Sequence, residues 1–206
     1  GGATGMVMVQ SSLPRPFRSR KSPCLGRLFT PRHNSSMKKT AEMGLPWAAD
    51  NDCFNGFDQP RWMDFTRKLI GLPGCLFATA PDVVADAAAT LDRFDTWEPY
   101  LHELGLPVAL VAQDGLTPET TPWDRLEAIF IGGSTEWKLG PEAREITADA
   151  KARGKWVHMG RVNSMRRAEY ARRIGCDSID GSGLARFSRD NLPGVLAVSS
   201  QTQLAI

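Results

Sequence analysis

Short apolar runs that end in a polar residue or a glycine occur again and again along the chain, and they constrain its fold more than any other feature. Six of them are clear: Leu45–Asp50, Cys75–Asp82, Val108–Gly115, Ala128–Gly133, Lys155–Gly160 and Asp177–Asp180. Buried parallel strands have this appearance. In barrels of such strands the functional residues collect at the carboxyl ends. We therefore expect the residues that end these runs to line one pocket.

Stretches with a helical pattern separate the apolar runs. The clearest of them are 61–70, 86–104, 141–153 and 164–174. Alternation of strands and helices predicts parallel pairing with right-handed crossovers. The chain has 206 residues, fewer than the roughly 250 of a typical barrel. We predict a compact (β/α)8 barrel of the TIM type, with an open doubly wound sheet as the alternative.

The chain divides into an arm and one domain. Residues 11–24 are rich in Ser, Pro and Arg, which is typical of flexible segments. We therefore expect residues 1–24 to form a basic, flexible N-terminal arm. Residues 25–206 are predicted to form a single catalytic barrel domain. The pattern of 25–31 is typical of a strand, and Met6–Val9 is a further candidate for the first strand of the barrel.

Composition excludes several classes of protein. No run of about 18 apolar residues occurs, so no membrane span is expected. The four cysteines lack the close spacing of structural zinc sites, and the three histidines are scattered. We expect a cytoplasmic protein with reduced thiols, no metal site and no cofactor.

Positive charge is concentrated near the start of the chain. Residues 1–40 contain eight basic residues and no acidic one, whereas the remainder contains 17 basic and 23 acidic residues. A basic arm on an acidic body suggests a polyanionic partner such as nucleic acid, and a solvated terminus is the plainer alternative. The candidate nucleic-acid contacts are Arg18, Arg20, Lys21, Arg32, Lys38, Lys39, Arg161 and Arg186.

Three aspartates and a glutamine end predicted strands and could perform chemistry. Asp50 and Asp180 could divide catalysis between a nucleophile and a proton carrier, or they could be ordinary turn or cap residues. Asp82 could accept hydrogen bonds from the edge of a base, or it could cap the next helix. Gln113 could bind a base carbonyl or ring nitrogen, or it could be an exposed loop amide.

Other strand ends could bind a flat ring. Gly132 and Gly133 could expose backbone N–H groups, although such pairs are common in turns. Met159 and Gly160 offer an apolar face, with a buried core methionine as the alternative. Phe54 could cover the opposite face of the ring, or it could belong to the core.

The order of these motifs resembles the tRNA-guanine transglycosylases, and most closely their short phage and bacterial relatives, the DNA 7-deazaguanine transglycosylases (deazapurine DNA-modification, or DpdA-like, proteins). The resemblance covers roughly residues 25–190. The segments that carry it are Ala49–Asn55, Ala80–Asp82, Val111–Gly115, Phe130–Gly133, His158–Gly160 and Gly175–Asp180.

The resemblance implies a base exchange in which guanine is replaced by free 7-deazaguanine. Asp180 would attack C1′ of the sugar and form a covalent glycosyl-enzyme, while Asp50 would act as general acid and base. The purine edge would be read by Asp82, Gln113 and the Gly132–Gly133 backbone, with the ring held between Phe54 and Met159.

One departure from the family concerns the substrate. The zinc-binding cysteines that follow the nucleophile in the tRNA enzymes are absent from the sequence, so no zinc subdomain is expected and DNA is favoured over tRNA as partner. The alternatives are a non-catalytic or partner-dependent nucleic-acid-binding subunit and a metabolic barrel enzyme with a phosphate site. The sequence leaves open whether the protein is a homodimer.

Overall fold

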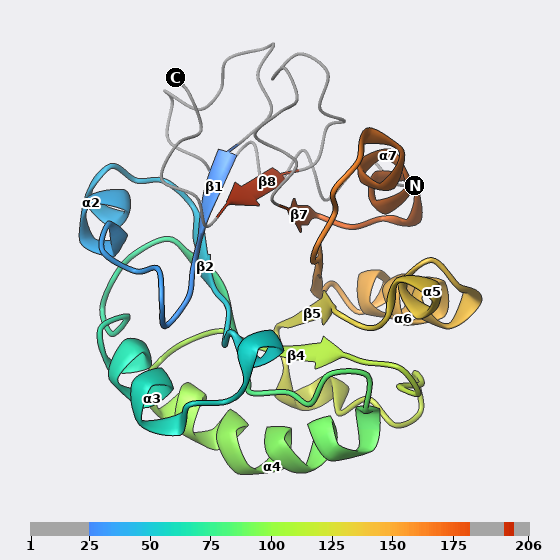
Figure 1. Ribbon diagram of the computed structural model, residues 1–206, viewed down its shortest axis with the longest axis horizontal. Coiled ribbons are helices and arrows are strands. Elements are labelled where there is room, and N and C mark those ends of the chain that lie inside the picture. Colours follow the sequence, from blue (N-terminus) through green and yellow to red (C-terminus); the bar gives the residue numbers. More distant parts are fainter. Residues whose placement is uncertain (1–24, 182–195, 200–206) are drawn as a thin grey trace.

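Eight parallel strands close into a barrel, and helices surround it (Figure 1). The computed structural model describes residues 25–181 and 196–199. The strands are β1 (Leu25–Phe29), β2 (Trp47–Ala49), β3 (Cys75–Thr79), β4 (Val108–Ala112), β5 (Ala128–Ile131), β6 (Trp156–Met159), β7 (Ser178–Asp180) and β8 (Leu196–Ser199). Between them lie α2 (Met37–Glu42), η2 (Cys53–Asn55), α3 (Gln59–Arg67), α4 (Ala87–Glu103), η3 (Trp123–Arg125), α5 (Thr135–Lys138), α6 (Pro141–Ala152) and α7 (Met165–Ile174). The predicted (β/α)8 barrel is confirmed, and the open sheet is excluded.

The strand that closes the barrel differs from the expectation. Met6–Val9, the candidate first strand, lies outside the described residues, as does the rest of the 1–24 arm. The place beside β1 is taken by β8, which pairs with β1 on one side and with β7 on the other. The apolar run around Val198 therefore supplies the eighth strand, at a place where no strand was predicted.

Side-chain caps set where α3, α4, α5 and α7 begin. The carboxylates of Asp58 and Asp86 accept the backbone N–H groups of the first turns of α3 and α4. The hydroxyls of Ser134 and Ser164 do the same for α5 and α7. Such caps satisfy N–H groups that have no partner within the helix. The helix α7 ends at Gly175, whose φ of 105° suits a residue without Cβ.

Alternation along the strands separates two apolar cores. One core lies inside the barrel and contains Phe77, Val111 and Phe130. The larger core lies between the strands and the helices, and it includes Met159 and Ile179. Successive residues of a strand point to opposite faces, so every second side chain enters the barrel and those between them face the helices.

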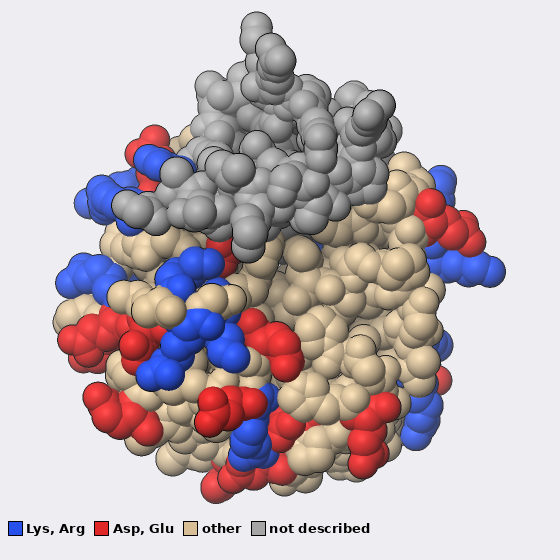
Figure 2. All heavy atoms as spheres, turned by 180° about the vertical axis from the view of Figure 1, so that it is seen from behind, with Lys and Arg blue, Asp and Glu red and all other residues tan. Residues whose placement is uncertain are grey.

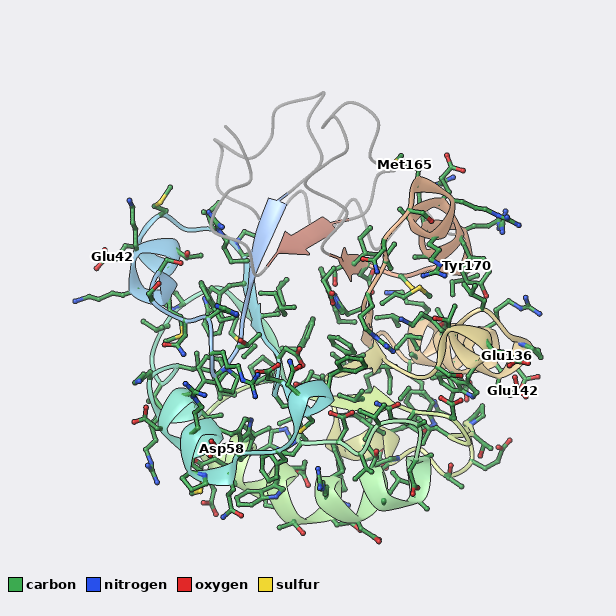
Figure 3. The ribbon with its side chains drawn as sticks, viewed as in Figure 1. Glu42, Asp58, Glu136, Glu142, Met165 and Tyr170 are labelled. Carbon is green, nitrogen blue, oxygen red and sulfur yellow. The ribbon has the colours of Figure 1, made fainter. Side chains whose placement is uncertain are left out.

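The outer surface is polar around the ring of helices. Glu42, Glu136 and Glu142 lie at its edge in Figure 3. On the face seen in Figure 2, acidic and basic side chains lie interspersed over one part, and much of the rest of the described surface is uncharged. Within the described ranges no helix has both the length and the apolar character needed to cross a membrane.

Candidate active site

A cavity of about 360 Å³ opens at the carboxyl ends of the strands. Its size lies near the lower end of the range of roughly 300–1,000 Å³ typical of small-molecule sites. Asp50, Asp82 and Asp180 all line it. They follow β2, follow β3 and end β7, so three carboxylates from distant parts of the chain share one cavity, as the strand pattern predicts.

Most of the predicted catalytic and base-binding residues lie at this cavity, and some do not. Those that line it are Asp50, Phe54, Asp82, Gln113, Gly132 and Asp180, together with the predicted nucleic-acid contacts Arg32 and Arg161. Gly133, Met159 and Gly160 are not among its lining residues. Lys38 and Lys39 are exposed on α2, away from the lining. Arg18, Arg20, Lys21 and Arg186 lie outside the described residues.

The expectation for Met159 is wrong. Its side chain is fully buried and packs in the core between the strands and the helices. The neighbouring strands are in register, with Met159 opposite Ile179 and His158 opposite Ser178. Since Asp180 points into the barrel, Ile179 and Met159 must point away from it. The plainer alternative, a buried core methionine, is the one observed.

The glycines at the strand ends serve close packing. A Cβ on Gly160 would lie 2.6 Å from the Phe130 ring, and one on Gly133 would overlap Trp137. The N–H of Gly132 already donates to the carbonyl of Ala112 at 3.0 Å, so this amide is not free for a base. Gly160 leaves room for the Phe130 ring, which lines the cavity as an apolar surface.

Asp180 is held at both carboxylate oxygens. The backbone N–H of Arg161 donates to Oδ1 at 3.1 Å, and Nε2 of His158 lies 2.7 Å from Oδ2. Arg161 adopts a φ of 56°, in the left-handed region that side chains other than glycine rarely enter. This backbone conformation accompanies the direct contact between its amide and the carboxylate.

Asp50 lies in a different electrostatic environment. Its Oδ1 receives a long hydrogen bond of 3.4 Å from the Thr79 hydroxyl, and the backbone N–H of Asn51 adds a weaker stabilisation of the ionised form. Burial, followed by the negative charges of Asp180, Asp82 and Asp52, raises the pKa of Asp50 to about 7. Desolvation and like charges both disfavour the ionised carboxyl. At neutral pH Asp50 can therefore both release and accept a proton.

Asp82 lies in an ordered hydrogen-bond network. Its two oxygens accept from the side-chain amides of Asn51 at 2.9 Å and Gln113 at 2.6 Å. Burial raises the pKa of Asp82, and the hydrogen bonds from Asn51 and Gln113 oppose that rise. The residue that caps α4 is Asp86, and Gln113 is buried. The alternatives of a helix cap and an exposed loop amide are therefore not observed.

Phe54 and Arg161 meet at the mouth of the cavity. The Arg161 guanidinium lies over the Phe54 ring, 5.0 Å from its centre, and Phe54 is 64% exposed. Nη2 of Arg161 donates to the carbonyls of Gly132 and Gly133, so this nitrogen is engaged within the protein. Nearby, Arg32 forms an ion pair with Asp52 at 3.0 Å.

Several residues of the site were not predicted as functional. Asn51 joins the Asp50 turn to Asp82, and His158 contacts Asp180 from inside the barrel. Lys138 is buried and donates to the carbonyl of Gly160. Burial and then the charge of Arg161 lower the pKa of Lys138 to about 8. No local sequence pattern marks either His158 or Lys138 as part of the site.

Among the described residues, no cluster of three or more His, Cys, Asp or Glu side chains could hold a metal ion. The three cavity aspartates are instead tied to protein donors.

The chain matches no protein-family model, and no curated protein matches it significantly. Solved structures with some similarity to the chain include an enolase from environmental sequencing of the Sargasso Sea, with 11% identity over 95% of this chain and 50% of the enolase, and a TM-score of 0.47. A ligand-free mutant tryptophan synthase from M. tuberculosis has 15% identity over 95% of this chain and 88% of its own, with a TM-score of 0.44. An HpcH/HpaI aldolase from Desulfitobacterium hafniense has 10% identity over 91% of this chain and 90% of the aldolase, with a TM-score of 0.40. The chain spans half the length of that enolase.

Proposed function

We propose that the protein is a pentosyltransferase that exchanges guanine in DNA for a 7-deazaguanine through a covalent glycosyl-aspartyl intermediate. The observation that carries the proposal is the pairing of Asp50 and Asp180 in one cavity with unlike surroundings. Asp180 is held by two donors, whereas the pKa of Asp50 is raised to about 7. Unlike environments for two carboxyl groups are the usual basis for dividing nucleophile and acid–base roles.

The proposed reaction conserves protons over its two halves. In the first half, an oxygen of Asp180 bonds to C1′, the bond from C1′ to N9 of guanine breaks, and protonated Asp50 gives its proton to the departing base. In the second half, Asp50 accepts the N9 proton of the incoming 7-deazaguanine. N9 then bonds to C1′, and Asp180 leaves as a carboxylate. No further reactant is needed.

The cavity suits a single base rather than a duplex. A volume of about 360 Å³ requires that the target nucleotide be turned out of the stack, as in other enzymes that act on bases. Asp82 and Gln113 offer an acceptor and an amide for the purine edge. Phe130 and Phe54 supply aromatic surfaces inside the cavity and at its mouth, in place of the Met159 stacking that the sequence suggested.

The test is base exchange on two polymers. The protein is incubated with DNA or tRNA and a free 7-deazaguanine, and the nucleosides of each polymer are analysed by mass spectrometry. We expect the modified nucleoside in DNA. Asp180→Asn should lose exchange by at least about 10³-fold, because the nucleophile is removed. Asp149→Asn is the matched control, since Asp149 is a surface residue in a weak 3.9 Å ion pair.

The outcomes separate the alternatives. A DNA–protein adduct that survives denaturation in the wild type and is absent from Asp180→Asn supports the covalent intermediate. DNA binding without exchange by the wild type supports the non-catalytic subunit, and exchange in tRNA alone supports the RNA-directed alternative. Undiminished exchange by Asp180→Asn contradicts the proposal.

A further inference from the structure

A chain of hydrogen bonds leads from the barrel interior to Asp180. Trp156 Nε1 donates to Ser178 Oγ at 2.8 Å, and Ser178 Oγ lies 2.7 Å from Nδ1 of His158. Nε2 of His158 lies 2.7 Å from Oδ2 of Asp180. All three supporting residues lie on the neighbouring strands β6 and β7, where His158 and Ser178 are direct partners in the register.

The chain has a direction, because its first member can only donate. An indole N–H has no acceptor, so Ser178 Oγ accepts from Trp156. Among the described residues, the only other hydrogen-bond partner of that hydroxyl is Nδ1 of His158. Ser178 is fully buried, and an O–H group without an acceptor is costly there. We therefore place the hydroxyl proton toward Nδ1, which is then unprotonated. The ring proton of a neutral His158 then lies on Nε2 and points to Asp180.

The surroundings of the imidazole favour this arrangement. His158 is fully buried, and its ring lies against Phe130 at 4.6 Å and Phe77 at 5.2 Å between ring centres. Packing on two aromatic rings fixes the orientation of the imidazole. The second oxygen of Asp180 is held independently by the Arg161 backbone. The plane of the carboxylate is thus defined by one donor on each oxygen.

We propose that His158 is a positioning residue for the nucleophile: as the neutral Nε2–H tautomer, set by Ser178 and Trp156, it orients the Asp180 carboxylate toward the cavity. The part concerning the nucleophile rests on the proposed function. In the reaction, His158 keeps its proton throughout. Its N–H bonds to Oδ2 while the ester forms at the carboxylate, and it bonds again to the full carboxylate when Asp180 leaves.

The tautomer can be measured without any activity. The protein has three histidines, so labelling with ¹⁵N-histidine gives few ring signals, and the loss of one set in His158→Gln assigns it. At pH 7.5 we expect Nε2 to be protonated and Nδ1 to be unprotonated. A proton on Nδ1, with or without one on Nε2, would overturn the inference.

Kinetics tests the positioning role. His158→Phe keeps a flat ring but removes the donor, and kcat should fall about 10²-fold, in the range known for the loss of one oriented donor. The KM for the free base should change less than about threefold, because His158 is absent from the cavity lining. His158→Gln places an amide N–H near the position of Nε2 and should recover most of the rate.

The results distinguish the two proposals. Equal loss in the Phe and Gln variants, or a loss confined to KM, contradicts positioning by the N–H. If His158→Phe fails to fold, the rate of His158→Gln and the tautomer measured in the wild type still test the positioning role. Absence of base exchange in the wild type contradicts the proposed function but not the hydrogen-bond direction. The measured tautomer of His158 then tests that direction independently of activity.

Discussion

At the scale of single residues, Asp50 illustrates a conflict between stability and activity. Its pKa is raised from 3.8 to about 7 by burial and by neighbouring aspartates. A carboxyl with a raised pKa binds its proton more tightly in the folded state, so stability falls as pH rises between these two values. Asp50→Asn removes this effect. We expect the variant to be more stable than the wild type at pH 8 by about 1–3 kcal/mol.

The measurement is urea unfolding of both proteins at pH 4 and pH 8. Near pH 4 the two free energies of unfolding should converge, because Asp50 is largely protonated in the folded wild type. The variant should also lose base exchange, since asparagine cannot carry the proton. A stability difference that is the same at both pH values would show that the charge of Asp50 is not its cause.

Sequence alone located the acids of the site but not all of their partners. Asp50, Asp82 and Asp180 were predictable because each follows an apolar strand, and parallel strands present their carboxyl ends at one rim. Met159 was misplaced because motif order does not reveal which face of a strand a residue occupies. The role of His158 depends on the register between β6 and β7, which no local pattern contains.

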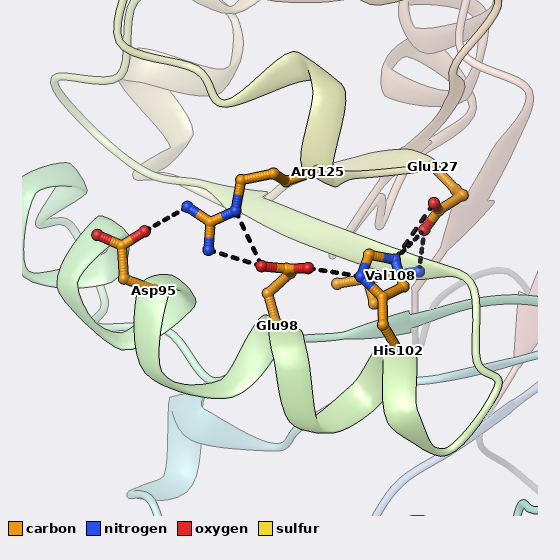
Figure 4. Close-up of polar contacts among 6 residues, drawn as sticks. All are labelled: Asp95, Glu98, His102, Val108, Arg125 and Glu127. Carbon is orange, nitrogen blue, oxygen red and sulfur yellow. Dashed lines mark hydrogen bonds and ion pairs between the residues drawn. The ribbon is translucent and has the colours of Figure 1, made fainter.

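At the scale of elements, a polar network joins α4 to the start of β4 and to the segment before β5 (Figure 4). Glu98 accepts from Arg125 at 2.6 Å and contacts His102 at 2.5 Å, and Glu127 contacts His102 at 3.0 Å. Glu127 also accepts the N–H of Val108, the first residue of β4. Burial alone would lower the pKa of His102, but the hydrogen bonds with Glu127 and Glu98 raise it overall.

This network makes a small part of the stability depend on pH. A histidine with a raised pKa contributes fully below its unfolded value of 6.5, and that contribution is lost as pH rises through the folded value. His102 is partly exposed, so we expect only about 0.5–1 kcal/mol. Between pH 5.5 and 8.5, urea unfolding should show a loss of stability that is larger in the wild type than in His102→Gln by this amount, since Asp50 contributes equally to both proteins. Identical pH dependence in both proteins would contradict it.

The sequence predicted the long helices well and the short elements poorly. The helices α3, α4, α6 and α7 each have an apolar face that packs in the core. Their observed bounds lie close to the predicted ones. The four-residue helix α5 was missed because it has too few residues to show a period. The short helix α2 begins only at Met37, after His33 has paired with Thr30 in an isolated bridge.

At the scale of the whole molecule, closure of the barrel depends on its last strand. The alternation of elements predicted the barrel, but local pattern could not show that Leu196–Ser199 rather than Met6–Val9 would fill the gap. The closing strand is determined by pairing between residues far apart in the chain. Val198 of β8 lies opposite Gly26 of β1 on one side and opposite Asp180 of β7 on the other. The candidate nucleophile therefore lies on a strand that β8 supports directly.

Deleting residues 196–206 should consequently destroy both fold and site. Without β8, the backbone groups of β1 and β7 lose their partners along a whole edge, and unpaired buried groups are costly. A domain stable by only about 5–15 kcal/mol cannot be expected to tolerate the loss of closure. Deleting residues 200–206 alone keeps β8 and is the matched control. Circular dichroism and urea unfolding should show cooperative unfolding in the control and none in the longer deletion. Cooperative unfolding of the longer deletion with unchanged stability would mean that β8 does not hold the barrel closed.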